Sequence, residues 1–201
     1  MPARIAILLS GRGSNFLELH GAMVRKEVPA EVALVISNVA EAQGLEQARS
    51  LRLPTVCLPH GHDPTRESHE AKILSALDHA QVEWICLAGF MRLLSTSFVA
   101  RYPERILNIH PSLLPAFPGR NAQEQAVEWG AKISGCTVHL VDEKLDHGPI
   151  VLQRSVPVHD GDNPISLSAR ILVEEHKIYP EALKRLLTER WRVEGRRVVF
   201  S

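Results

Sequence analysis

Short apolar runs alternate with longer amphipathic stretches through the first half of the chain. The apolar runs are rich in Ile, Leu and Val, which indicates buried β-strands. They comprise residues 5–9, 32–36, 55–58, 84–87 and 106–109. The stretches between them are typical of helices and comprise residues 15–25, 41–51 and 68–80. The last of these has an apolar face formed by Ala71, Ile73, Leu74, Leu77 and Ala80. This alternation predicts a parallel sheet with right-handed crossovers, covered by helices on both faces.

The pattern changes after residue 130. Residues 134–141 and 150–158 indicate paired strands joined by the acidic loop DEKLDHG, and residues 191–200 indicate a terminal hairpin. We found no repeats and no long linker in the sequence. The chain is therefore predicted to be an α/β protein with an open, mostly parallel twisted sheet and an antiparallel portion in its C-terminal half. A single domain over residues 1–201 is expected.

A long helix is expected between the two paired regions, over residues 164–189. Asn163 suits the N-cap of this helix, and Pro164 suits its first position. Pro180 lies in the interior and lacks a backbone N–H, so it is expected to kink or split the helix.

Charge and hydropathy narrow the class of partner. The 201 residues carry 23 Lys and Arg against 23 Asp and Glu, so no net field would attract nucleic acid or a membrane surface. No apolar stretch approaches the roughly 20 residues needed to span a bilayer. The apolar part of the N-terminus covers only residues 5–9, which is too short for a signal peptide. Small-molecule partners and a cytoplasmic location are expected.

The cysteines and histidines do not form a familiar metal or disulfide pattern. Cys57, Cys86 and Cys136 are odd in number and far apart, which suits a reducing compartment. His60 and His62 are the nearest approach to a ligand pair, but they flank a glycine in a loop between prolines, and no further ligand follows at a usual spacing. We expect no bound metal.

A glycine-rich loop, SGRGSN, lies between the first predicted strand and helix, at Ser10 to Asn15. Such loops follow the carboxyl end of a strand, where backbone N–H groups at a helix start attract phosphate. A dinucleotide site would need glycine at Phe16 and an acidic residue after the second strand, where Ser37 and Asn38 stand. The loop favours a single phosphate, although a tight turn with Ser14 capping the helix explains it equally well.

The segment NIHPSLLPAFPG, residues 108–119, ends the fifth predicted strand. Asn108 and His110 are two residues apart and so share one face of the strand. An Asn amide can donate to a developing oxyanion, and a His can act as a general acid or stabilise charge. The prolines that follow would fix the next loop at a low entropic cost, as suits the wall of a binding site. Considered alone, the pair is more often a brace for a loop.

Asp146 in KLDHGP is the candidate partner of His110. A carboxylate close to an imidazole would raise its pKa and favour the charged ring. The alternative is that the acids of this loop only solvate a hairpin turn, which is the interpretation favoured for Asp142 and Glu143.

Five motifs in fixed order carry a resemblance to a known family. They are SGRGSN, LAGFMRLL, NIHPSLLPAFPG, GCTVHLVDEKLDHGPIVLQ and EEHKIYP. Together they resemble the phosphoribosylglycinamide formyltransferase family over nearly the whole chain. The resemblance implies a Rossmann-like formyltransferase fold, with residues 1–110 as a phosphate-binding half and residues 111–201 completing the folate and catalytic cleft. It also implies transfer of the formyl group of 10-formyltetrahydrofolate, as a co-substrate, to the amine of 5-phosphoribosylglycinamide in purine synthesis.

The resemblance assigns roles to individual residues. It implies a catalytic trio of Asn108, His110 and Asp146. It implies contacts with the phosphorylated substrate at Gly13, Ser14, Asn15 and Glu175. It implies folate contacts at Arg66, Met91, Arg92, Leu93, Leu94, Val141 and Asp142, together with Asn108 and Asp146. It implies no metal, and a monomer or a homodimer.

One departure and three alternatives remain. The family typically has a His where this chain has Asn121, which puts any auxiliary role at that position in doubt; Asn121 is instead expected to cap a helix beginning at Ala122. A formyltetrahydrofolate hydrolase and a methionyl-tRNA formyltransferase share the Asn-x-His and Asp pattern, but each normally carries an additional domain. A nucleotide-binding module without catalysis would use residues 13–15 and would not need the trio.

Overall fold

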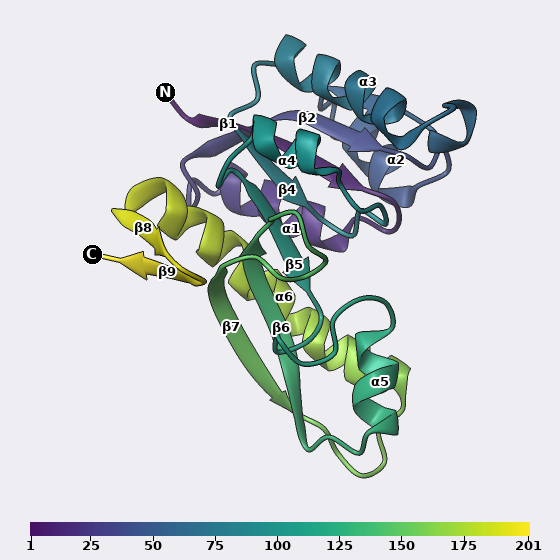
Figure 1. Ribbon diagram of the computed structural model, residues 1–201, viewed down its shortest axis with the longest axis vertical. Helices are drawn as coiled ribbons and strands as arrows, with labels where there is room; N and C mark the ends of the chain where they lie inside the picture. The colour runs from purple at the N-terminus through teal and green to yellow at the C-terminus, as the bar shows by residue number, and fades with distance from the viewer. The chain divides into compact units, whose positions relative to one another are not determined.

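The computed structural model describes residues 1–201, apart from the side chain of His62. It divides into two compact units, residues 1–107 and residues 108–201. Figure 1 shows the ribbon of both, coloured along the chain. The predicted α/β class is confirmed, because the strands of the first unit pair in parallel and the second unit contains antiparallel pairs.

The first unit alternates strands and helices in the predicted order (Figure 1). Its elements are β1 (Ala3–Leu9), α1 (Ser14–Val24), β2 (Ala30–Ser37), α2 (Gln43–Ser50), β3 (Thr55–Cys57), the 3₁₀ turn η1 (His60–His62), α3 (Arg66–His79), β4 (Trp84–Leu87) and α4 (Thr96–Arg101). The strand β5 (Ile106–His110) crosses the boundary between the two units.

The sheet of the first unit has the order β3-β2-β1-β4, with all pairs parallel. β1 therefore has β2 on one side and β4 on the other, so the chain reverses its direction of winding at β1. In open α/β sheets, ligands bind beyond the carboxyl end of the strand at such a point. The glycine-rich loop directly follows β1, which gives it this position in the fold.

β1 is completely buried from Ile5 to Leu9, and β4 is buried throughout. Burial on both faces accounts for their continuous apolar sequences. α1 and α2 pack against β2 and against each other.

The second unit contains α5 (Ala122–Glu128), β6 (Ile133–Leu140), β7 (Ile150–Pro157), α6 (Pro164–Thr188), β8 (Trp191–Glu194) and β9 (Arg197–Phe200). β6 and β7 form the predicted antiparallel pair, and β8 and β9 form the predicted hairpin. α6 packs on β6 and β7, burying apolar residues such as Ile171 and Ile178.

The predicted helix and strand boundaries agree with the structure within two residues. Asn163 caps α6 as expected, since its side chain accepts hydrogen bonds from the N–H groups of Ile165 and Ser166 at 2.9 and 3.0 Å. Of the two effects expected of Pro180, the split is wrong, because α6 runs without interruption past it (Figure 1), and the kink stays a prediction. Packing of the buried face on two strands compensates for the one hydrogen bond that a proline cannot make.

Three further features of the structure do not follow from the sequence patterns. The short helix α4 is absent from the sequence prediction, because six residues are too few to show a helical period. Ala71 is exposed, and the inner face of α3 instead carries His69 and Glu70 beside Ile73 and Leu77. Ser14 does not cap α1, since the N-cap position belongs to Gly13.

β6 and β7 approach so closely that a side chain at Gly135 has no room. A Cβ built there would lie 2.0 Å from the backbone oxygen of Arg154 on β7. Gly135→Ala should therefore force the strands apart and lower the free energy of unfolding by about 2 kcal/mol or more, as measured by urea denaturation. Gly161→Ala is the matched control, because among the described atoms nothing lies within 4 Å of its Cβ. Equal stability of the two variants would contradict the close approach.

Candidate active site

The side chains of Asn108 and His110 come from the end of β5, two residues apart and on one face, as predicted. Ile106 and Leu107 before them are completely buried and anchor the strand. His110 is itself buried, with 4% of its surface exposed, whereas Asn108 is half-buried. The strand thus places a half-buried amide and a buried imidazole on one face.

Asp146 lies against His110, with 3.4 Å between its Oδ2 and the Nδ1 of the imidazole. Its side chain is only 9% exposed. The same Oδ2 accepts a hydrogen bond of 2.7 Å from the backbone N–H of Gly119. Asp146 adopts a left-handed backbone conformation, with φ of 47°. The tight turn before β7 therefore aims this carboxylate inward, and does not leave it to solvate a hairpin.

The other ring nitrogen of His110 also has an oxygen partner. Nε2 lies 2.9 Å from the carbonyl oxygen of Phe117, which can only accept, so Nε2 carries a proton and donates. Nδ1 faces the carboxylate of Asp146, and a doubly protonated ring can donate to both oxygens. The ring therefore lies between a carboxylate oxygen and a carbonyl oxygen.

A second histidine, His139 of β6, joins this cluster and was missed in the sequence. It is 2% exposed. Its Nε2 lies 3.2 Å from the Nδ2 of Asn108 and 3.8 Å from the Oδ1 of Asp146, while its Nδ1 lies 2.9 Å from the Leu140 carbonyl. Burial lowers the pKa of His139, a shift that the Leu140 carbonyl and the charge of Asp146 oppose only in part. The available signal was a His near the end of a strand whose other residues are apolar or small and uncharged.

The proline-rich loop, residues 111–118, is held by a buried hydroxyl as well as by its prolines. Thr137 donates to the carbonyl of Ser112 at 2.7 Å and accepts from the N–H of Leu114 at 3.0 Å. The side-chain amide of Gln153 donates to Thr137 Oγ1 and to the Leu114 carbonyl, each at 2.9 Å. The Leu114–Pro115 peptide bond is cis. These bonds fix the loop that supplies the carbonyl partner of His110.

The glycine-rich loop lies in the first unit, and its Gly13 is the N-cap of α1, with φ of 77°. Glycine provides no side-chain cap, so the first-turn N–H groups face the loop without a side-chain competitor for an anion. Gly13 also contacts α2, because a Cβ built on it would lie 2.5 Å from the Cα of Gly44. Ser14 and Asn15 follow directly as the first residues of α1, and both are half-buried.

Ser10 connects this loop to the segment of residues 91–94. Its hydroxyl accepts from the N–H of Met91 at 2.9 Å and donates to Asn38 Oδ1 at 2.5 Å. Met91 and Leu93 are 64% and 50% exposed. Leu94 is buried and Arg92 half-buried.

The far end of the same segment is fixed by a buried carboxylate. Glu70 of α3 is 4% exposed and accepts hydrogen bonds from both the N–H and the hydroxyl of Ser95. Ser95 in turn caps α4 by accepting from the N–H of Phe98 at 3.2 Å. Arg66, the first residue of α3, is 41% exposed, with its Nε 3.7 Å from Glu67.

The remaining predicted residues belong to the second unit. Glu175 is buried on α6 beside β6, where its charge is one of the causes that raise the pKa of Cys136 to about 12, after burial itself. The Asp142 carboxylate makes its contacts within the turn that contains it. It accepts a hydrogen bond from the N–H of Lys144 at 3.0 Å and lies 2.7 Å from Nδ1 of His147. Val141 precedes it and is half-buried.

Asn121 occupies the N-cap position of α5, as expected, in a left-handed conformation with φ of 57°. Within the described part of the chain, however, its side chain makes no capping hydrogen bond. The expected capping role is therefore wrong for the side chain, although the start of the helix at Ala122 is correct.

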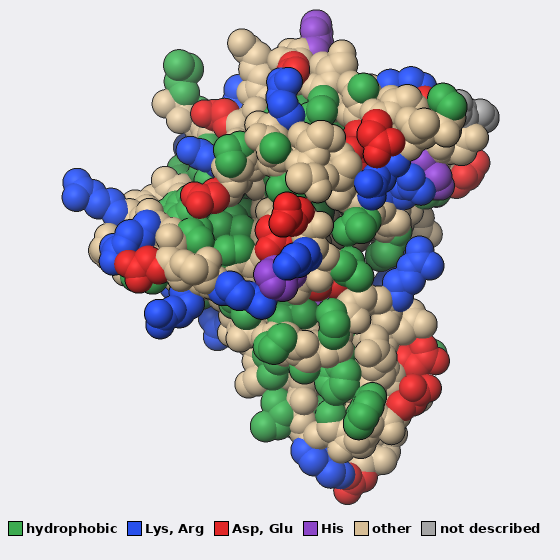
Figure 2. All heavy atoms as spheres, viewed as in Figure 1, with side chains coloured by type: hydrophobic (Ala, Val, Ile, Leu, Met, Phe, Trp, Pro, Cys, Tyr) green, Lys and Arg blue, Asp and Glu red, His purple; other side chains and the backbone are tan. Residues whose placement is uncertain are grey.

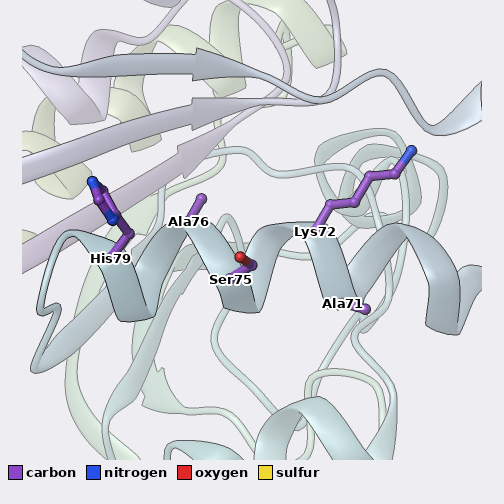
Figure 3. Close-up of a pocket in the computed structure, with 5 residues that line it drawn as sticks. All are labelled: Ala71, Lys72, Ser75, Ala76 and His79. Atoms are coloured by element: carbon purple, nitrogen blue, oxygen red, sulfur yellow. The ribbon is translucent and has the colours of Figure 1, made fainter.

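Other surface features do not suggest a competing site. A shallow hollow along α3 is lined by Ala71, Lys72, Ser75, Ala76 and His79 (Figure 3), and none of these is a predicted catalytic or binding residue. On the face shown in Figure 2, basic and acidic side chains are interspersed.

Among the side chains that the structure describes, which exclude His62 of the predicted His60–His62 pair, no group of three or more His, Cys, Asp or Glu could hold a metal ion. No helix in the described part combines the length and apolar character needed to cross a bilayer.

Comparison with known proteins identifies relatives whose similarity extends over most of this chain. The profile of a family described as "Formyl transferase" matches residues 3–183. The phosphoribosylglycinamide formyltransferase of Escherichia coli (strain K12) is 40% identical over 192 residues, which cover 96% of this chain and 88% of that protein. The crystal structure of glycinamide ribonucleotide transformylase 1 from Symbiobacterium toebii is 45% identical, with a TM-score of 0.97 and coverage of 99% and 94% of the two chains.

Another relative is much longer. The trifunctional purine biosynthetic protein adenosine-3 of Drosophila pseudoobscura pseudoobscura is 47% identical over 182 residues. These cover 90% of this chain but only 13% of that protein. The chain thus matches one part of a larger multifunctional polypeptide.

The lowered pKa of His139 predicts a dependence of stability on pH. Below the ordinary pKa of 6.5, the unfolded chain binds a proton that the folded state resists, so the free energy of unfolding should fall by up to about 1.4 kcal/mol per pH unit. Urea denaturation at pH 8 and pH 5.5 measures this loss. His139→Gln should lose less stability between these two pH values, because it removes the titrating group. If the free energy of unfolding fell equally in the wild type and in His139→Gln, the pH dependence could not be assigned to His139.

Proposed function

The chain belongs to the formyl transferase family, and from this premise we propose that it is a phosphoribosylglycinamide formyltransferase. The proposed reaction moves the formyl group of 10-formyltetrahydrofolate to the amine of 5-phosphoribosylglycinamide, a step of purine synthesis. The observation that carries the proposal is the buried cluster in which His110 lies between an acidic and a carbonyl oxygen, next to the amide of Asn108. The choice of substrate is supported by the similarity of the chain to the E. coli phosphoribosylglycinamide formyltransferase, which extends over 88% of that protein.

The chemistry requires a stabilised oxyanion. A neutral amine attacks the formyl carbon, and the carbonyl oxygen acquires negative charge in a tetrahedral intermediate. Donors that are already oriented toward this oxygen stabilise the charge and usually contribute the largest single effect in acyl transfer. We assign this role to the Nδ2–H of Asn108 and to a protonated His110. The 3.4 Å between Nδ1 of His110 and Asp146 is longer than an ordinary hydrogen bond, so a substrate oxygen can compete for that proton.

Proton transfer completes the reaction. The attacking amine loses a proton, and N10 of the folate gains one when the carbon–nitrogen bond breaks. We assign the relay to a water molecule held by Asp146, whose carboxylate also faces Nδ1 of His110. Gly119 N–H holds one carboxylate oxygen in place during these steps.

The binding residues divide between the two substrates. We assign the phosphate to the helix start formed by Gly13, Ser14 and Asn15, and the ribosyl-glycinamide portion to Glu175. The pterin and its glutamate tail are assigned to the segment of residues 91–94, to Arg66, and to Val141 and Asp142. The exposed apolar side chains of Met91 and Leu93 support this assignment, because an aromatic pterin can cover them.

The proposal involves small molecules alone and needs neither nucleic acid nor a membrane. A monomer or a homodimer would satisfy it. The two buried cysteines, Cys86 and Cys136, are thiols and not disulfides, which supports a reducing cytoplasm as the proposed location.

The proposed function is tested by following formyl transfer from 10-formyltetrahydrofolate to glycinamide ribonucleotide. Release of formate without the amine acceptor would instead identify a hydrolase. Binding of the nucleotide without either reaction would leave a binding module.

Asn108→Ala, His110→Ala and Asp146→Ala should each lower kcat by roughly 10²- to 10⁴-fold, because each removes an oxyanion donor or a proton-transfer group. Steady-state kinetics with both substrates measures the loss. Asp160→Asn is the matched control, since this carboxylate is 89% exposed on the surface and should leave turnover unchanged. Near-normal turnover in all three variants would refute the trio.

Ser14→Ala and Asn15→Ala should weaken binding of the phosphorylated substrate and leave folate affinity nearly intact, because they alter only the helix start assigned to the phosphate. Calorimetric titration with each substrate measures both affinities. Unphosphorylated glycinamide riboside is the control ligand, and its affinity should hardly respond. A similar loss for both substrates would show that the loop serves folding in general.

A further inference from the structure

His139 is the one buried titratable group of the polar cluster in the second unit that the proposed reaction leaves without a task. It lies on β6, at a shift in the pairing register between Val138 and His139. With 2% of its surface exposed, it has little contact with solvent. Both of its ring nitrogens meet polar atoms of the protein, at Leu140 and at Asn108.

The hydrogen-bond partners determine which nitrogen carries the proton. A backbone carbonyl can only accept, so the 2.9 Å contact between Nδ1 and the Leu140 oxygen requires a proton on Nδ1. A neutral ring then has only a lone pair on Nε2. Burial lowers the pKa of His139 and so favours the neutral ring.

The charged groups nearby do not place a second proton on His139, so its ring keeps a proton on Nδ1 and a lone pair on Nε2. Asp146 Oδ1 lies 3.8 Å from Nε2, beyond hydrogen-bond distance, and its other oxygen is engaged by Gly119 N–H and faces His110. A second positive ring would also lie close to a protonated His110, whose charge opposes protonation of His139. Asp142 contributes only a weaker attraction.

The lone pair on Nε2 determines how the Asn108 amide is turned. Nε2 must accept, so the group 3.2 Å away has to be the NH₂ and not the oxygen of the amide. One N–H of Asn108 is then used by His139, and the second N–H remains for another acceptor. Without this partner the amide could rotate by 180° about its terminal bond and present its oxygen to a developing negative charge.

We propose that His139 is a positioning residue that holds the Asn108 amide with an N–H directed at the oxyanion of the formyl-transfer intermediate. This inference rests on the proposed function, because it assigns His139 a task in that reaction. His139 acts only through Asn108 and does not touch the reacting atoms. Because the oxyanion exists only in the transition state and intermediate, the benefit should appear in kcat and hardly in KM.

The test combines substitutions at both positions. His139→Leu removes the acceptor and should lower kcat by roughly 10- to 100-fold, a smaller effect than loss of the donor itself, with both KM values within about twofold of wild type. His139→Gln restores an acceptor oxygen and should recover most of that loss. In an Asn108→Ala background, His139→Leu should lower kcat no further, because the group that it orients is gone.

A buried histidine can also matter only for folding, and a control addresses this. His69 is likewise 2% exposed, and its Nε2 donates to the Leu58 carbonyl, 2.7 Å away, in the first unit. His69→Leu should lower the melting temperature without the loss of kcat. Equal factors for His139→Leu with and without Asn108, or a loss confined to KM, would overturn the proposal.

The tautomer gives a readout that does not need activity. Nitrogen-15 NMR of the wild-type imidazoles at pH 7 should show His139 with a protonated Nδ1 and an unprotonated Nε2. A proton on Nε2 would overturn the inference whatever the reaction. Wild-type enzyme without formyl transfer would instead overturn the proposed function, and the positioning role with it, while the tautomer would still be measured.

Discussion

A carboxylate that is nine-tenths buried must be compensated, and the second unit is organised around how Asp146 is compensated. The charge is met by the Gly119 N–H from one loop and by His110 from β5. Each of these groups comes from a different segment, so the carboxylate fixes the end of the proline-rich loop and the turn before β7 at once. The same carboxylate lies 3.4 Å from a ring nitrogen of His110 and 3.8 Å from one of His139, and burial lowers the pKa of His139. Two imidazoles in one cluster thereby have different surroundings, which is the usual basis for separate tasks.

The conformation of the proline-rich loop, residues 111–118, depends on the hydrogen bonds that one hydroxyl group can make. The Thr137 hydroxyl has one proton to donate and two lone pairs, and the structure uses all three, at the Ser112 carbonyl, the Leu114 N–H and the Gln153 amide. Prolines reduce the number of conformations open to the loop, but they do not select one. The selection is made by this hydroxyl on the neighbouring strand. The Phe117 carbonyl, and with it the proton on His110 Nε2, is consequently set by residues outside the loop.

Much of the fold was accessible from the sequence, because periodicity and the caps of long helices are local properties. Asn108 and His110 were assigned to one face from their spacing alone, and the structure brings Asp146 to His110 as predicted. What the sequence could not provide depends on contacts between distant segments. The importance of His139 is apparent only from its contact with Asn108, which lies thirty-one positions away in the sequence. The continuity of α6 through Pro180 depends on its packing against two strands, and Gly13 replaces Ser14 as the cap because the chain must turn left-handed there.

The contact between Gly13 and Gly44 limits how this protein can be made more stable. Glycine inside a helix such as α2 costs about 1 kcal/mol relative to alanine, so Gly44 is a position that a conventional stabilising design would alter first. A methyl group there would lie 2.9 Å from the Cα of Gly13 and press on the start of α1. The glycine in α2 thus lowers its helix propensity, and it allows the backbone of α2 to lie close to the glycine-rich loop. Thermal robustness of this helix and the shape of that loop cannot be optimised independently.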